Sequence, residues 1–390
     1  MPFLLPLLAL LLLSAAPTVT EVVASMSECD DNFLYQAPPQ IKGILEGGNI
    51  LDQNRYKPIC QTLNNKRTFV TLYDTTNKIP VFSAYNYTGK ERIDRLMIEP
   101  QLEEITLNKN MEVEDDSKCY IHQAVSGDYS NSPEYIRGNL LPQSYGLTKN
   151  HKKSTFTMTN IVPQVKSFNT GSWSNMEKCV QCVLDKYCIN NNGKPEGFVV
   201  IGARPSNNHL LNNKVNIPSM LWSAFCCYSK SQGPLAGAHW GDNTEDGETV
   251  LQTKTLAQLH RKLGGRSEVF PGTNCPLYTT VTDLYPNLNK ACKCPAPTTT
   301  KTTAATTSTT KVTTTTTTTT KKREKDENDK EREKGRNDGS SGGDMEPANP
   351  IPGGGLHVYQ TFFNYSYANC HQLYNLTWNF LYIWPCQYHI

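Results

Sequence analysis

Two polar segments near the middle of the 390-residue chain, about 20 residues apart, carry side chains that could bind a cation or a phosphate. The first contains Arg137 and Asn139, and the second contains Asn169 and Glu177. Amide and carboxylate oxygens are the ligands that Mg²⁺ accepts, and it takes few of them because it keeps most of its waters. Taken alone, Asn169 also suits a turn before a helix, and Glu177 suits the first turn of a helix, where the dipole favours a carboxylate.

The residues around these positions resemble the DNA/RNA non-specific endonuclease family, which has a ββα-metal (His-Me finger) fold. The strings that carry the resemblance are YIRGNLLP at 135–142, TNIVPQ at 159–164 and FNTGSW at 168–173, with Glu177 following. More narrowly, the chain looks like the secreted endonuclease domain-containing 1 proteins of vertebrates. The similarity extends over roughly residues 29–265, and it implies an α+β domain.

The resemblance implies a role for each polar residue. Asn169, four residues before a tryptophan, matches the family's direct Mg²⁺ ligand, and the carboxylate of Glu177 would orient metal-bound waters. Glu177 lies eight residues on, about two helical turns and ~12 Å of rise away. Arg137 falls on the phosphate side of the site. DNA or RNA is the substrate that the family leads us to expect, with hydrolysis of the phosphodiester assisted by the metal.

The first segment departs from the family pattern. Active members read Asp-Arg-Gly-His where this chain has Ile136, Arg137, Gly138 and Asn139. The missing histidine is the general base, and its loss typically costs 10²–10⁴-fold in rate because an amide does not titrate near neutral pH. Gln181 also stands where many relatives have a basic residue. We therefore expect an impaired nuclease; the alternative is an inactive secreted glycoprotein that binds nucleic acid or protein.

Other histidines and a basic run lie near the motif. We expect His122 in a strand and His151 in a basic loop, Lys149–Lys153, that could meet phosphates. Both histidines are treated as ordinary surface or core residues rather than as substitutes for the base.

Composition divides the chain into four parts. Residues 1–20 read as a signal peptide, because the apolar run FLLPLLALLLL precedes small residues and is shorter than the ~20 residues of a bilayer-spanning helix. Residues 23–295 have ordinary globular composition. Residues 296–355 form a linker that is first threonine-rich, then charged and finally glycine-rich, and it should be disordered. Residues 356–390 are an aromatic-rich tail without a structural prediction or a predicted transmembrane segment.

Export implies an oxidising compartment, in which the cysteines pair. Eleven of the 13 cysteines lie in 23–295, so one must remain unpaired or pair elsewhere. Adjacent Cys226 and Cys227 should not pair with each other, and the CxxC at 179–182 is read as disulfide-forming rather than as a zinc site. Glycosylation sequons stand at Asn86, Asn364 and Asn375.

Local patterns predict the elements that must position the site. Strands are expected at 67–73, 81–85 and 197–201, and a fourth at Ser154–Met158 inside the central sheet. Residues 135–139 should lie on or beside a β-hairpin arm. A helix is expected over Ser174–Tyr187, begun by a capping box of Ser174 and Glu177.

Overall fold

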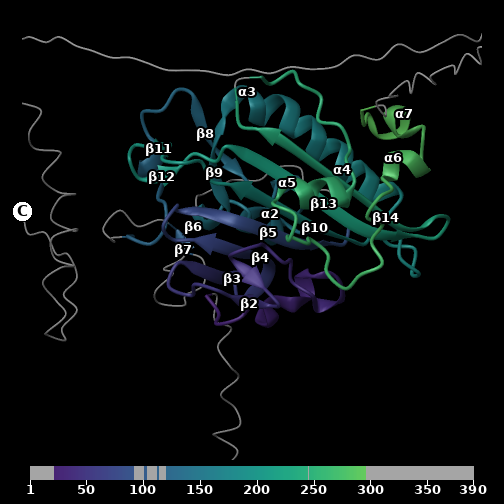
Figure 1. Cartoon of the computed structure of the whole chain (residues 1–390), viewed down its shortest axis with the longest axis horizontal. Helices are drawn as coiled ribbons and strands as arrows, with labels where there is room; N and C mark the ends of the chain where they lie inside the picture. Colours follow the sequence, from purple (N-terminus) through teal and green to yellow (C-terminus); the bar gives the residue numbers. More distant parts are fainter. Residues whose placement is uncertain (1–21, 92–100, 103–111, 114–119, 245, 296–390) are drawn as a thin grey trace, which may run out of the picture. The chain divides into compact units, whose positions relative to one another are not determined.

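The computed structural model describes residues 22–91, 101–102, 112–113, 120–244 and 246–295 (Figure 1). The predicted signal peptide, the linker 296–355, the tail 356–390 and the sequons at Asn364 and Asn375 lie outside these residues. The predicted α+β class is confirmed.

Six antiparallel strands form the central sheet, in the order β14-β13-β10-β5-β4-β3. Their bounds are β3 Tyr56–Leu63, β4 Lys66–Asp74, β5 Ile79–Tyr87, β10 Gly197–Arg204, β13 Met220–Ser229 and β14 Gly233–Asp242. Three of these, β4, β5 and β10, contain the strands predicted at 67–73, 81–85 and 197–201. Short two-stranded pairs surround the sheet: β1 Leu45–Glu46 with β2 Asn49–Ile50, β6 Gln101–Leu102 with β7 Glu112–Val113, β8 Tyr135–Asn139 with β9 Ile161–Val165, and β11 Leu210–Leu211 with β12 Val215–Asn216.

The described helices are short apart from one. The α-helices are α2 Lys149–Ser154, α3 Lys166–Phe168, α4 Ser174–Lys186, α5 Leu256–Lys262, α6 Val281–Leu284 and α7 Leu288–Cys292. Five of the described elements are 3₁₀-helical: η1 Met26–Asn32, which is kinked at Cys29, η2 Leu34–Gln36, η3 Ser126–Tyr129, η4 Gln143–Tyr145 and η5 Met158–Asn160. The turn η6 Asn169–Trp173 is π-helical.

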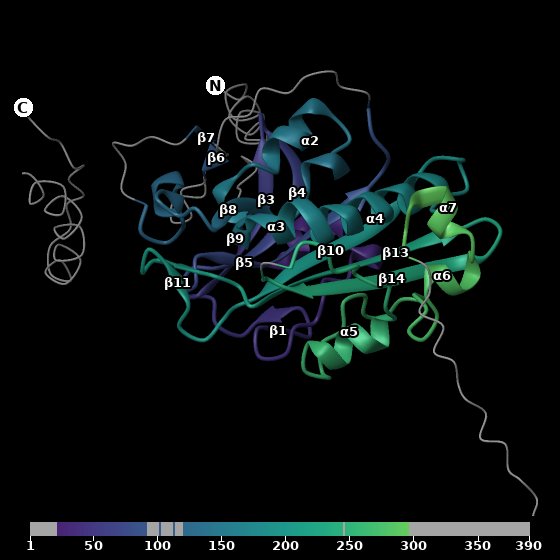
Figure 2. The ribbon, with the colours of Figure 1, turned by 90° about the horizontal axis from the view of Figure 1, so that it is seen from above.

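Each face of the sheet has its own core, because neighbouring residues of a strand point to opposite sides. Val199 and Ile201 of β10 pack with α4, whereas Val200 between them packs with α5 and the N-terminal turns. Figure 2 shows α4 and α5 on opposite sides of the strands β10, β13 and β14. The candidate site belongs to the α4 side.

The strand predicted at Ser154–Met158 is wrong. Thr148 caps α2 by accepting a hydrogen bond from the His151 amide at 3.2 Å, so the helix runs through to Ser154. The hydroxyls of Ser154 and Thr155 then donate to carbonyls three residues back, 2.8 and 2.9 Å away. These local side-chain bonds compete with strand pairing and turn the chain.

Five disulfides join described cysteines: Cys29–Cys60, Cys179–Cys294, Cys182–Cys292, Cys188–Cys227 and Cys226–Cys275. The expectation that adjacent Cys226 and Cys227 do not pair with each other is confirmed, as is the disulfide role of the CxxC at 179–182. The eleventh cysteine, Cys119, lies outside the described residues. This number of disulfides indicates an oxidising compartment.

Candidate active site

The two polar segments of the sequence meet as the antiparallel pair β8–β9. Asn139 stands opposite Ile161, Gly138 opposite Val162 and Ile136 opposite Gln164. The chain continues from β9 through α3 and η6 into α4, so a strand pair followed by a helix carries all four predicted site residues. Residues 135–139 therefore lie on a hairpin-like arm, as the sequence predicted.

Gln164 is the centre of this arrangement. Its side chain is fully buried, and its Oε1 accepts a hydrogen bond from Nδ2 of Asn169. The Gln164 side chain lies across Gly138, where an added Cβ would come within 1.8 Å of Oε1. A glycine at 138 is thus required for the Gln164–Asn169 contact, and the bonded Nδ2 leaves the Oδ1 of Asn169 directed elsewhere.

The π-helical turn η6 begins at Asn169 and leads directly into α4. π-turns inside helices are rare and occur frequently at functional sites. Because α3, η6 and α4 follow one another without a break, Ser174 makes no side-chain cap, and the capping box predicted there is wrong. Trp173, fully buried, packs against Phe168 with ring centroids 5.6 Å apart and fixes the turn in the core.

Glu177 stands in the first turn of α4, with its backbone carbonyl accepting from the Tyr145 hydroxyl at 3.2 Å. Burial raises the pKa of its carboxyl to about 8, against the opposing effects of the Trp173 indole and the Lys178 charge. At neutral pH the carboxyl is therefore mostly protonated in the chain on its own, and a nearby cation would favour its ionised form.

Asn139 is half-buried, and its side-chain N–H group is committed to Thr155. Nδ2 donates to the Thr155 carbonyl at 3.0 Å and lies 3.2 Å from its hydroxyl. Buried Asn160 donates to the same carbonyl at 2.8 Å and also bonds the backbone of Leu141 in both directions. At position 139 the local structure therefore needs only a side-chain N–H group that donates to Thr155. An asparagine amide and a histidine imidazole both have such a group.

Arg137 lies on the exposed side of β8. Its guanidinium Nη1 donates to the Ser126 hydroxyl at 3.0 Å, and the side chain remains open to solvent. This leaves most of its donors available to an anion.

A distant loop fixes the turn from β9 into α3. The Asn243 carbonyl oxygen Oδ1 accepts from the Val165 amide at 2.9 Å, and its Nδ2 donates to the carbonyls of Pro163 and Pro218, both at 3.0 Å. Gly171 and Gly247 allow the loop to touch the helix, since a Cβ on Gly171 would lie 2.1 Å from the Gly247 carbonyl. Sequence reasoning missed Asn243, because no local pattern links it to a segment some 80 residues earlier.

A family model for DNA/RNA non-specific endonucleases matches residues 47–261, more than half of the chain. The chain belongs to this family.

Two curated relatives are similar over the same domain. The human endonuclease domain-containing 1 protein is 27% identical over 268 residues, 66% of this chain and 49% of the relative. The mouse protein of the same name is 29% identical over 279 residues, 69% and 52% of the two chains. This endonuclease-family chain therefore spans about half the length of those relatives. Among solved structures, a chain of the EndoG/EndoGI complex shares 19% identity with a TM-score of 0.43, over 56% of this chain and 91% of that one.

The two histidines that lie near the motif in sequence, His122 and His151, have settings that differ from the predicted ones. His122 lies among bends rather than in the predicted strand, and His151 lies in helix α2 rather than in a loop. The Nδ1 of His151 is 3.1 Å from the Tyr85 hydroxyl, and burial lowers the pKa of the imidazole. The structure thus directs His151 to Tyr85, whereas Asn139 is bonded to Thr155.

The described residues contain no group of three or more His, Cys, Asp or Glu side chains that could hold a metal. The predicted site does not need such a group of side chains, since a single protein oxygen suffices for a Mg²⁺ ion that keeps its waters. Asn169 suits this role, because Gln164 takes its N–H and leaves its Oδ1 available. The amide oxygen of Asn169 therefore fits a Mg²⁺ ion that keeps most of its waters. The role of Glu177 in orienting those waters stays a prediction.

The Asn86 sequon lies inside β5, next to Phe198 of β10 in register. Its Oδ1 is buried without a hydrogen-bond partner among the described residues. Glycosylation at Asn86 stays a prediction.

None of the described helices has the length and apolarity needed to cross a bilayer.

Proposed function

We propose that this domain binds DNA or RNA without sequence preference and hydrolyses phosphodiesters only weakly. The observation that carries the proposal is the pairing of Gln164 with Asn169 over Gly138, beside a position 139 that has an amide in place of the base. The side that would hold a cation offers the amide oxygen of Asn169, while the group that would remove a proton from water is missing.

Each residue has a role in this proposal. When bound at Asn169, Mg²⁺ would supply positive charge to balance that developing on the phosphate. Arg137 would contact a phosphate oxygen from the exposed side of β8, and Glu177 would orient waters. Asn139 can hydrogen-bond to the attacking water but cannot accept its proton at neutral pH, which is why the rate should be low.

The basic helix α2 supports binding of a polyanion next to this site. The helix ends one residue before Thr155, the partner of Asn139, and Lys149, Lys152 and Lys153 project from it. A hollow of about 360 Å³ lies beside it, lined by residues that include Lys66, Lys149 and His151. Lysine contacts to phosphates supply affinity without reading bases, as a non-specific binder requires.

Plasmid cleavage with Mg²⁺ tests the proposal directly. The purified chain should be a poor nuclease, and Asn139→His should raise its rate by about 10²-fold, at the low end for a general base because Ile136 and Gln181 remain unfavourable. The imidazole N–H can take over the bond to Thr155, so the variant should keep its fold. Equal rates for the two proteins would show that position 139 is not where the base belongs.

A second candidate is a binding protein without catalysis on the same scaffold. It is favoured by the way Thr155 fixes the Asn139 side chain, which keeps the local structure without any titrating group. In that case DNA or RNA binds in a salt-dependent manner, neither the wild-type chain nor Asn139→His cleaves it, and Mg²⁺ produces no thermal shift.

We also propose that the chain is secreted, with residues 1–20 as its signal peptide and a glycan at Asn86. The five disulfides support an oxidising destination. Expression in cultured cells should place the protein in the medium. Glycosidase treatment should lower its mass, and the decrease should be smaller when Asn86 is replaced by Gln, because the sequons at Asn364 and Asn375 remain. Finding most cysteines free by thiol titration of denatured, unreduced protein would contradict secretion.

A further inference from the structure

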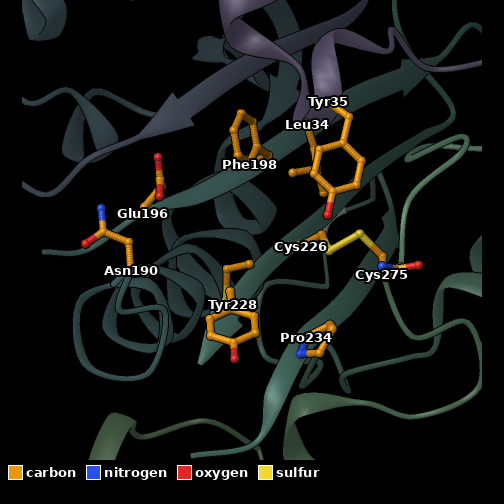
Figure 3. A pocket seen from close by; sticks show the side chains of 11 residues that line it. Leu34, Tyr35, Asn190, Glu196, Phe198, Cys226, Tyr228, Pro234 and Cys275 are labelled. Carbon is orange, nitrogen blue, oxygen red and sulfur yellow. A yellow bond between two sulfur atoms is a disulfide. The ribbon is translucent and has the colours of Figure 1, made fainter. Parts of the chain in front are cut away.

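A second hollow, of about 250 Å³, lies on the face of the sheet opposite α4, away from the candidate active site (Figure 3). None of Asn139, Asn169 and Glu177 lines it. Its wall combines three aromatic rings, a disulfide and a single charged side chain, and no lysine, arginine or histidine borders it. A nucleic-acid backbone would therefore find no counter-charge there.

Strand alternation explains how these groups come together. Phe198 of β10 stands opposite Cys226 of β13, and Tyr228, two residues further along β13, points to the same face. Glu196 precedes Phe198 by two residues, which brings its side chain to that face as well. Figure 3 shows Phe198 between Glu196 and Tyr35, with Tyr228 on the opposite side of the hollow.

The wall is rigid where it presents its aromatic rings. The Cys226–Cys275 disulfide lines the hollow and joins β13 to the loop before α6. Tyr35 and Gln36 adopt left-handed backbone conformations, with φ of 55° and 58°, which residues other than glycine rarely take. Such conformations persist where the surroundings enforce them and are concentrated at ligand sites. Here the left-handed turn holds the ring of Tyr35 at the rim with 66% of its surface exposed.

Glu196 determines which ligand this hollow suits. Glu196 is half-buried, and its carboxylate has no ion pair or side-chain hydrogen bond with any residue that the structure describes. A carboxylate partly removed from water is stabilised by a cation. The faces of Tyr and Phe rings attract cations as well, and Arg or Lys groups bind within about 6 Å of a ring centroid.

We propose that this hollow binds an organic cation, the guanidinium or ammonium head of a ligand, between Glu196 and the rings of Tyr35, Phe198 and Tyr228. Its volume suits one arginine or lysine side chain rather than a larger molecule, which typically needs ~300–1,000 Å³. The cation could be a free small molecule or a side chain in an exposed segment of another protein. The proposal is independent of nuclease activity, because the site shares no residue with it.

The test is a titration of the full chain with acetylated, amidated Gly-Ser-Arg-Ser-Gly, followed by calorimetry. The matched neutral ligand is the same peptide with citrulline, which keeps the shape of arginine without its charge. We expect the arginine peptide to bind weakly, with a Kd of order 10⁻⁴–10⁻³ M, and at least about 10-fold more tightly than the citrulline peptide. Tetramethylammonium chloride is the third ligand, and tighter binding of this ion than of the peptide would point to a free small molecule.

Two pairs of variants locate the site. Glu196→Gln should remove the preference for arginine over citrulline, while Glu134→Gln, which removes one negative charge at an exposed position outside the hollow, should preserve it. Tyr228→Phe should bind as the wild type does, and Tyr228→Leu should bind about 5-fold more weakly because the ring is lost. Equal binding of both peptides to the wild type, or equal weakening by the two glutamate variants, would overturn the proposal.

Discussion

The helical side of the candidate site and its strand side are built under different constraints. On the helical side, Asn169 is held by buried Gln164, which needs Gly138, and the turn that follows Asn169 packs closely on Gly247 through Gly171. On the strand side, Arg137 is exposed with one hydrogen bond, and Asn139 requires only a donor N–H toward Thr155.

This difference separates packing from catalysis. The helical side is part of the core, so its residues stabilise the fold whether or not a reaction takes place there. Position 139 can exchange one donor for another at little structural cost, and with that exchange it loses the base. An intact helical side is therefore weak evidence for activity, and the strand side decides it.

The largest effect should come from removing the proposed metal ligand in a variant that has a base. Asn169→Ala introduced into Asn139→His should lower plasmid cleavage by about 100-fold or more, to background, because Mg²⁺ loses its one direct protein ligand. Thermal unfolding with and without Mg²⁺ supplies a readout independent of cleavage, and the Mg²⁺-dependent shift should disappear. Asn175→Ala, at an exposed position on α4, is the control and should change neither quantity.

A smaller effect is expected from Gly138→Ala, a change on the strand side that acts on the helical side. The new methyl group must displace the Gln164 side chain, so Asn169 loses its hydrogen-bond partner and its fixed orientation. In the Asn139→His protein, cleavage should fall by about 10-fold, and stability should fall by about 1–3 kcal/mol, as in overpacked cores. Gly127→Ala, where a Cβ meets nothing within 4 Å, should leave both unchanged.

Glu177 makes a prediction about stability against pH. Its carboxyl binds a proton more tightly in the folded chain, with a pKa of about 8, than in the unfolded chain, with the ordinary value of 4.5. The free energy of unfolding should therefore fall as pH rises from 4.5 to 8 and level off above. Glu177→Gln should reduce this fall by about 1 kcal/mol, since partial solvation screens the shift. Identical pH profiles of thermal unfolding in the two proteins would contradict the raised pKa.

The smallest effect concerns the start of α4. Ser174→Ala should change the free energy of unfolding by less than about 0.5 kcal/mol, because the preceding π-turn leaves Ser174 without a capping role. Thr255→Ala, which removes the capping box of α5, should cost about 1 kcal/mol in the same denaturant titration. A larger loss at Ser174 would mean that α4 begins there as a separate helix.

The sequence predicted the parts of the fold whose signals are local. Residues that favour strands, bounded by a turn composition, marked β4 and β5, and a short apolar run marked β10. The helix predicted over Ser174–Tyr187 is α4, although the capping box expected at its start is absent. Thr155 and Thr157 suggested a strand because they also favour extended structure, but hydroxyls near carbonyls also stabilise turns, and composition does not distinguish the two outcomes. The family strings placed the site on a strand pair and a helix.

The rest of the site depends on contacts between distant segments. Gln164 was visible in the family string, but its bond to Asn169 requires Gly138 from another strand. Asn243 carries no pattern of its own, and the partner of Asn139 is the backbone of Thr155. The raised pKa of Glu177 likewise follows from packing around α4, which one sequence does not specify.

Two of the disulfides determine how mechanical force would enter the domain. Cys179 and Cys182, one turn apart on α4, are bonded to Cys294 and Cys292 at the end of the described chain, and α7 lies beside the end of α4 (Figure 1). Tension applied through the residues that follow 295 would pass through these covalent links into α4, the longest described helix. The load would therefore reach the helix that holds Glu177 as well as the backbone that precedes Cys292.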